Sequence, residues 1–386
     1  MPKIFEGHAH QMFYNNKVPV RESVFSFKKQ FRINEIDKVR FLALPCHARP
    51  EREMLRKIGF DETEHIDNAK AMYFKCAFSP KGYAFAGLEY DKVDFTDKKA
   101  TAKELLRQVT EYKKVGFDGM KMFEGHPNFR YMLGCPLDDE IFDLYYEFCE
   151  KEGFPIIMHL TNSPDMWDRE KISPYWVGRG CFFDERFPSF DQIQEELIRV
   201  LEKFPKLKFT LAHFGFLTFV PKRAEKFMSF ENTMLDVTPG GNNYFNILAD
   251  KEYWIPFIKK YIDRFTYGTD MYNTKYSYEW LYVASTTDRA GLVRQFFETT
   301  TEHYYGDQKF CGIGLEKEML DKIYHDNLYN LLKEPKQVDY DYFINKCDEV
   351  IKEFDETHIE YYNIWCMKND FTSMKEHGYI EYFRQV

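Results

Sequence analysis

Short apolar runs alternate with longer charged segments along most of the chain. The runs are four to six residues long and rich in β-branched and aromatic residues, which is typical of buried strands. The intervening segments carry apolar residues at helical spacing, as in residues 100–115, where Leu105, Val109 and Tyr112 recur before Gly116. This pattern predicts eight strands, at residues 4–8, 39–44, 84–88, 118–123, 155–160, 208–213, 233–237 and 265–268.

Eight strands that alternate with helices predict a (β/α)8 TIM barrel. A doubly wound open sheet is less favoured, because no Gly-x-Gly-x-x-Gly turn follows the first strand. Residues 11–22 and 163–188 are long connections after the first and fifth strands, and we expect them at the carboxyl ends of the barrel strands. We therefore expect a barrel domain over residues 1–336 with loop insertions, and a helical C-terminal extension over residues 337–386, packed on the barrel or at a subunit interface.

Composition and charge favour a globular protein with a small-molecule substrate over a protein that binds nucleic acids or membranes. The 386 residues are 44% hydrophobic and carry a net charge of −9, which favours a globular fold and disfavours nucleic acids and anionic membranes as partners. No uncharged apolar run approaches the roughly 18 residues of a membrane-spanning helix, and the amino terminus turns polar too early for a signal peptide. We expect a cytoplasmic protein with a small-molecule substrate and, because such assemblies are common, a homodimer.

Candidate chemistry begins at the first predicted strand, which ends in His8-Ala9-His10. Side chains at positions i and i+2 leave the same face of a strand, so both imidazoles can reach one metal ion. A His-x-His pair is a weak signal by itself, since chance alone gives about 0.3 such pairs in a chain of this composition.

Ionisable residues also close other predicted strands, where an apolar residue is the default. They are Lys121, His159, His213 and Asp270, and a barrel collects such strand ends at its catalytic mouth. Taken singly, each histidine is more often a hydrogen-bonded core residue, and Asp270 could equally cap a helix. Together, imidazoles and a carboxylate favour Zn²⁺, Mn²⁺ or Fe²⁺ over Ca²⁺ or Mg²⁺.

Three cationic side chains are candidates for substrate binding. Lys121 could anchor a substrate carboxylate or be an ordinary rim lysine. Arg130 and Arg179 lie in the connections after the fourth and fifth strands and could bind an anion, although a solvent-facing arginine is the commoner case.

The ordered set of motifs resembles the amidohydrolase superfamily, in particular its amidohydrolase-2 branch of aminocarboxymuconate-semialdehyde decarboxylase-like enzymes. The motifs are His8-x-His10, Gly116-Phe-Asp-Gly-Met-Lys121, Ile157-Met-His159, Leu211-Ala-His213-Phe-Gly215, Tyr267-Gly-Thr-Asp270 and Asp326-Asn-Leu-Tyr-Asn-Leu-Leu332.

The resemblance implies a distorted barrel with one catalytic divalent metal ion, zinc first, with manganese or iron as alternatives. The implied ligands are His8, His10, His159 and Asp270. His213 takes the place of the family's sixth-strand histidine, and Asp270 also handles the proton of metal-bound water. Lys121 lies in a sequence more like the mononuclear members than like those with a bridging lysine.

These residues lead us to expect a metal-dependent hydrolase that acts on an ester, lactone or amide of a small organic molecule, with Asp270 and His213 as catalytic residues. Two alternatives stay open. The same site could serve a non-oxidative decarboxylase, or a hydratase or isomerase, of a small carboxylic acid. The barrel could also bind a metal or ligand without catalysis.

Overall fold

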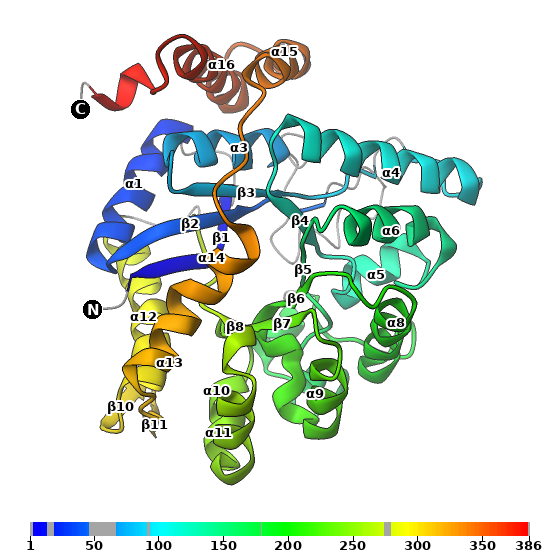
Figure 1. Cartoon of the computed structure of the whole chain (residues 1–386), viewed down its shortest axis with the longest axis vertical. Helices are drawn as coiled ribbons and strands as arrows, with labels where there is room; N and C mark the ends of the chain where they lie inside the picture. Colours follow the sequence, from blue (N-terminus) through cyan, green and yellow to red (C-terminus); the bar gives the residue numbers. More distant parts are fainter. Residues whose placement is uncertain are drawn as a thin grey trace.

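A ring of parallel strands forms the centre of the protein (Figure 1). The computed structural model describes residues 3–13, 19–45, 67–90, 93–178, 180–273 and 279–384. The strands lie in the order β8-β7-β6-β5-β4-β3-β2-β1-β9, and all of these pairs are parallel. Their bounds are β1 Ile4–Phe13, β2 Ile36–Leu42, β3 Gly82–Ala86, β4 Gly119–Met122, β5 Ile156–Met158, β6 Phe209–Leu211, β7 Thr233–Asp236, β8 Phe265–Thr266 and β9 Met271–Asn273.

Two short strands of the last barrel segment close the ring. Strand β8 pairs with β7, and β9, which follows it after four residues, pairs with β1 at Ala9 and His10. All eight predicted strands are present, so the predicted (β/α)8 barrel is confirmed. Strand β9 was not predicted, because the glycine and polar residues at 268–270 interrupt the apolar run.

Helices cover the outside of the ring, as the periodicity predicts. Asp97 caps α4 by accepting the backbone N–H groups of Lys99 and Ala100, and Gly116 ends this helix in the left-handed conformation. The larger helices are α1 Val20–Ile33, α3 Asp67–Ala77, α4 Lys98–Val115, α5 Pro127–Leu133, α6 Asp143–Lys151, α8 Phe190–Lys203, α9 Pro221–Met228, α10 Asn243–Ala249, α11 Lys251–Lys260, α12 Glu279–Glu298, α14 Asn327–Leu332, α15 Tyr340–Val350 and α16 Ile359–His377. The shorter ones are α7 Pro174–Gly178 and α13 Lys317–Asp321, and an exposed hairpin joins β10 Glu302–Tyr305 to β11 Gln308–Cys311.

Apolar side chains fill the barrel interior below the histidines. Phe5, Tyr83, Phe85 and Ile157 come from the strands, and helix α14 adds Leu328 and Leu332 to the same cluster. The Asn327 side chain donates to the carbonyl oxygens of Ile262 and Phe265, both at 2.8 Å, and so fixes α14 next to β8. The amino-terminal end of the barrel is therefore packed, which leaves the carboxyl ends of the strands for chemistry.

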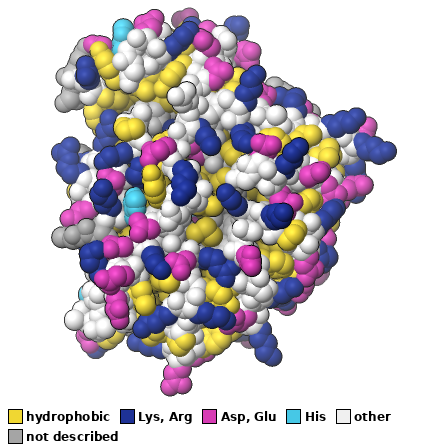
Figure 2. Space-filling model, viewed as in Figure 1, with side chains coloured by type: hydrophobic (Ala, Val, Ile, Leu, Met, Phe, Trp, Pro, Cys, Tyr) yellow, Lys and Arg dark blue, Asp and Glu magenta, His cyan; other side chains and the backbone are white. Residues whose placement is uncertain are grey.

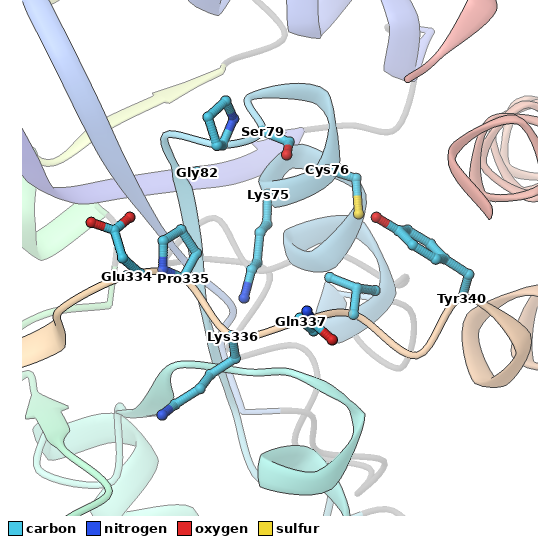
Figure 3. A pocket seen from close by; sticks show the side chains of 11 residues that line it. Lys75, Cys76, Ser79, Gly82, Glu334, Pro335, Lys336, Gln337 and Tyr340 are labelled. Atoms are coloured by element: carbon cyan, nitrogen blue, oxygen red, sulfur yellow. The ribbon is translucent and has the colours of Figure 1, made fainter. Parts of the chain in front are cut away.

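The chain leaves the barrel through residues 333–339 and ends in the helices α15 and α16. The Lys336 N–H donates to Asp118 Oδ1 at 2.7 Å, which fixes this connection beside β4. A cavity of about 440 Å³ lies between it and the end of α3, and Figure 3 shows Lys75, Ser79, Lys336 and Tyr340 around it. This cavity lies at the amino-terminal end of β3, on the opposite side of the barrel from the histidines.

Acidic and basic side chains are interspersed on the face shown in Figure 2, without a continuous basic patch there. Within the described ranges, every helix is too short or too polar to cross a bilayer.

Candidate metal centre

His8 and His10 are both buried on β1 and direct one ring nitrogen each toward Asp270. The Nδ1 atom of His8 lies 2.7 Å from Asp236 Oδ2, and that of His10 lies 2.8 Å from the carbonyl oxygen of Leu42. These contacts leave both Nε2 atoms free, at 3.7 and 3.6 Å from Asp270 Oδ1. An outer partner on Nδ1 fixes the ring and its tautomer, as is usual for metal-binding histidines.

The three donors fit a divalent metal ion. The ligand atoms of His8, His10 and Asp270 all lie within 4.8 Å of one another. Burial lowers the pKa of both imidazoles, that of His10 to about 3, so both are neutral and can donate a lone pair to a metal. Two imidazoles and one carboxylate are a donor set that suits zinc, manganese or iron.

Asp236, at the end of β7, organises this centre, although the sequence analysis did not select it. One carboxylate oxygen contacts His8, and the other accepts the backbone N–H groups of His213 at 2.6 Å and Thr238 at 3.2 Å. Asp236 lies in the predicted strand at residues 233–237, and an acidic residue in an apolar run is the sequence signal that could have identified it as a site residue.

Glu6 has a comparable role on β1. Its carboxylate accepts the His8 N–H at 2.8 Å, the Thr269 N–H at 3.0 Å and the Thr269 hydroxyl at 2.8 Å. Glu6 therefore joins the strand of His8 to the residue before Asp270.

His213 lies beside the three donors because of an unusual backbone. Residues 213–216 all have φ between 53° and 59°, in the left-handed region that non-glycine residues rarely adopt. The ring centroid of His213 lies 5.1 Å from that of His8 and 5.0 Å from that of His159. A Cβ atom at Gly240 would lie 2.8 Å from the Cβ of His213, so glycine is required there.

His159, the fourth predicted ligand, lies next to His213 but is not one of the three clustered donors. Its Nε2 contacts the side-chain amide of Asn162 at 3.1 Å, and that amide also lies 2.9 Å from the Nε2 of His126. Asn162 and His126 were not among the predicted site residues, because they become partners of His159 only through the loops after β4 and β5.

Lys121 is buried at the end of β4. Among the described residues, none forms a hydrogen bond or an ion pair with its ammonium group, and burial lowers its pKa to about 8. Asp236 and Asp270 lie near enough to raise this pKa, so the ammonium faces the metal centre.

Comparison with known proteins identifies the family. A family model described as Amidohydrolase matches residues 92–332, which is more than half of the chain. The chain belongs to the amidohydrolase family. The resemblance of the sequence motifs is thereby confirmed, and with it an enzyme of a metal-dependent family. A comparison with curated protein sequences finds no match.

Solved structures of similar fold include an uncharacterized TIM-barrel protein from Bordetella bronchiseptica, with 15% identity, a TM-score of 0.50, and coverage of 86% of this chain and 98% of that one. A dihydroxybenzoic acid decarboxylase from Polaromonas sp. JS666, described with bound manganese and 2-nitroresorcinol, has 15% identity, a TM-score of 0.49, and coverage of 86% and 97%. A 4-oxalomesaconate hydratase from Rhodopseudomonas palustris has 13% identity, a TM-score of 0.47, and coverage of 91% and 99%. At these identities, the likeness concerns the barrel fold alone.

Arg289 on α12 is a further residue of this amidohydrolase that the sequence analysis missed. Its Nη1 donates to the backbone oxygen of Asp270 and lies 3.3 Å from Asp270 Oδ2. Asp270 has a φ of 56°, so the arginine holds a residue whose backbone is in the left-handed region.

Arg130 differs from both expectations, since it is neither solvent-facing nor available to an anion. Its guanidinium is buried and forms two hydrogen bonds with Glu196, at 2.9 and 3.0 Å. This bidentate pair uses the donors that a substrate would need. Arg179 lies outside the described residues, so its predicted role stays a prediction.

Glu124, in the loop after β4, gives the amidohydrolase a testable pH dependence. Its carboxyl group accepts the Tyr90 hydroxyl and the Phe123 N–H, both at 2.6 Å, and burial raises its pKa from 4.5 to about 7. Because its pKa is raised, Glu124 is more easily accommodated by the folded state as the neutral acid. The stabilisation by neutral Glu124 is therefore complete below about pH 4.5 and is lost as the pH rises through 7.

Replacement of Glu124 by Gln, which resembles the neutral acid, is expected to remove this loss. Between about pH 5 and pH 8, the free energy of unfolding of the wild type should fall relative to that of Glu124→Gln by up to about 3 kcal/mol. Urea denaturation at both pH values measures the difference. Parallel pH profiles of the two proteins would show that Glu124 stays ionised in the folded state.

Proposed function

We propose that this amidohydrolase is a metal-dependent enzyme that removes CO2 from a small organic carboxylic acid without an oxidant. The observation that carries the proposal is Lys121, a buried cation that faces the metal centre and forms no hydrogen bond or ion pair within the described part of the chain. Burying an unpaired charge is costly, and a substrate carboxylate would offset that cost. The preferred reaction therefore differs from the hydrolysis that the sequence analysis placed first.

The residues have distinct roles in this proposal. His8, His10 and Asp270, with His159 as a fourth candidate, would hold one divalent ion. Zinc, manganese and iron all suit this donor set. When bound, the ion supplies a Lewis acid that holds oxygen atoms of the substrate. Lys121 binds and orients the substrate carboxylate.

Decarboxylation breaks the bond between the carboxyl carbon and its neighbour, and the electron pair stays on the neighbouring carbon. That carbon must then take up a proton, and Asp270 and His213 are our candidates to deliver it. Arg289 keeps the Asp270 carboxyl group in place for this transfer.

Hydrolysis of an ester, lactone or amide is the second candidate, favoured by the position of Asp270 between the two imidazoles. There Asp270 would act as a base toward water, with His213 stabilising the oxyanion. A neutral ester gives Lys121 no partner, so the two candidates predict different effects of changing this residue.

The test compares carboxylic acids with their methyl esters as substrates of the metal-loaded protein. We expect CO2 release from an acid, and for Lys121→Gln a KM raised by at least about tenfold with a smaller change in kcat. Lys75→Gln is the matched control, because Lys75 is also buried but pairs with Asp118 at the other end of the barrel. Ester cleavage without CO2 release would favour the hydrolase, and bound metal without turnover of either class would favour a binding protein.

A further inference from the structure

Asp67, the first described residue of α3, joins the ends of two neighbouring barrel strands. Its Oδ2 accepts the Leu44 N–H at 2.7 Å, and its Oδ1 accepts the side-chain amide of Gln11 at 2.9 Å. We propose that Asp67 is a positioning residue of the metal centre, acting through His10. This inference rests on the proposed metal site and names a residue that the site itself does not contain.

Both contacts of Asp67 lead directly to His10. Gln11 follows His10 in the chain, and Leu44 lies two residues beyond Leu42, whose carbonyl oxygen contacts the Nδ1 of His10 at 2.8 Å. Asp67 therefore fixes two segments next to His10. Through Gln11 it holds the backbone of the strand that carries His10, and through Leu44 it holds the end of β2, whose Leu42 carbonyl orients the His10 ring. Outer partners of this kind direct the ligand atom toward the metal.

The C-terminal helix α16 holds α3 in this position. Lys70, one turn after Asp67, forms a buried ion pair with Glu360 at 3.1 Å, and these side chains are 4% and 0% exposed. Asn363 accepts the N–H of Val20, the first residue of α1, at 2.8 Å. Figure 1 shows α16 beside α1 and α3, so the C-terminal extension fixes the starts of the two helices that follow β1 and β2.

A second buried aspartate provides a matched control. Asp118 also ties chain segments together, since it accepts the N–H groups of Ala84 at 2.9 Å and Lys336 at 2.7 Å and pairs with Lys75 at 2.8 Å. It does so at the amino-terminal end of the barrel, where its partners Lys75 and Lys336 line the cavity of Figure 3. Loss of Asp118 should therefore cost stability without touching the metal centre.

The experiment measures zinc affinity of the full chain by competition with a chromophoric chelator, together with the melting temperature. Asp67→Asn is isosteric but replaces one acceptor oxygen with a donor, so it cannot accept from both Leu44 and Gln11. We expect zinc binding weakened by about 10- to 100-fold in Asp67→Asn. Asp118→Asn should melt earlier yet bind zinc within about threefold of the wild type. Glu360→Gln should weaken zinc binding by at least about threefold.

A folded Asp67→Asn protein with zinc affinity within about threefold of the wild type would overturn the proposal. If Asp67→Asn does not fold, Gln11→Met removes one of the two contacts, and unchanged zinc affinity there has the same meaning. Unchanged affinity in Glu360→Gln removes the role of α16. A wild type that binds no zinc, manganese or iron overturns the metal site itself, whereas a zinc-binding wild type with an unaffected Asp67→Asn overturns only the role of Asp67.

Discussion

Replacement of both His8 and His10 by alanine is expected to reduce the metal content of the purified protein from about one equivalent per chain to none. The two Nε2 atoms and Asp270 are the donors that the fold brings within 4.8 Å of one another. The variant keeps Asp270 and, at most, His159, and one carboxylate with one imidazole binds zinc or manganese too weakly to survive purification. Elemental analysis of protein purified without chelator measures the change.

The barrel itself should remain folded in this double variant. Each alanine loses one buried hydrogen bond, to Asp236 or to the Leu42 carbonyl, at a cost of about 1–3 kcal/mol. The matched control replaces His303 and His325, which contact Thr299 and Asp326 outside the cluster. Full metal content in the double variant at His8 and His10 would remove these residues from the metal site.

Replacement of Asp270 by Asn is expected to lower turnover by at least about a hundredfold, while metal binding is retained or weakened. The amide keeps one oxygen for the ion, and Arg289 can still donate to the backbone oxygen of residue 270, but the amide can neither give nor take a proton at neutral pH. The measurement is kcat on the substrate that the comparison of carboxylic acids and methyl esters identifies, corrected for the metal content of each preparation.

Arg289→Lys tests whether the position of the Asp270 carboxyl group matters in addition to its ability to transfer a proton. Lysine keeps the charge beside Asp270 but not the guanidinium geometry, so turnover should fall less than in Asp270→Asn. Turnover of Asp270→Asn close to that of the wild type at equal metal occupancy would remove Asp270 from proton transfer.

Most of the barrel could be predicted because its strands are local apolar runs. The histidines at strand ends could be selected for the same reason, since an imidazole stands out where an apolar residue is expected. The roles of Glu6 and Asp236 could not be predicted, because their partners Thr269 and His8 come from distant strands that meet only when the ring closes. Arg130 was misjudged because its partner Glu196 lies on a helix one strand further along the chain.

The orientation of side chains within the site was also beyond the sequence. His159 occupies a predicted strand end, yet its Nε2 faces Asn162, a contact set by the loop after β5. Arg289 lies on a helix after the last strand, where an arginine carries no signal of its own.

The pairing of β9 with β1 has a consequence for the order of events during biosynthesis. The strand of His8 and His10 leaves the ribosome before Asp270, which emerges only after seven further strands, directly before β9. Contacts between residues this far apart in the sequence form late in folding, because the long stretch of chain between them must first be brought together at a cost in entropy. The three donors therefore come together only after most of the barrel strands have been made, and metal binding follows formation of the nearly complete barrel instead of guiding its folding.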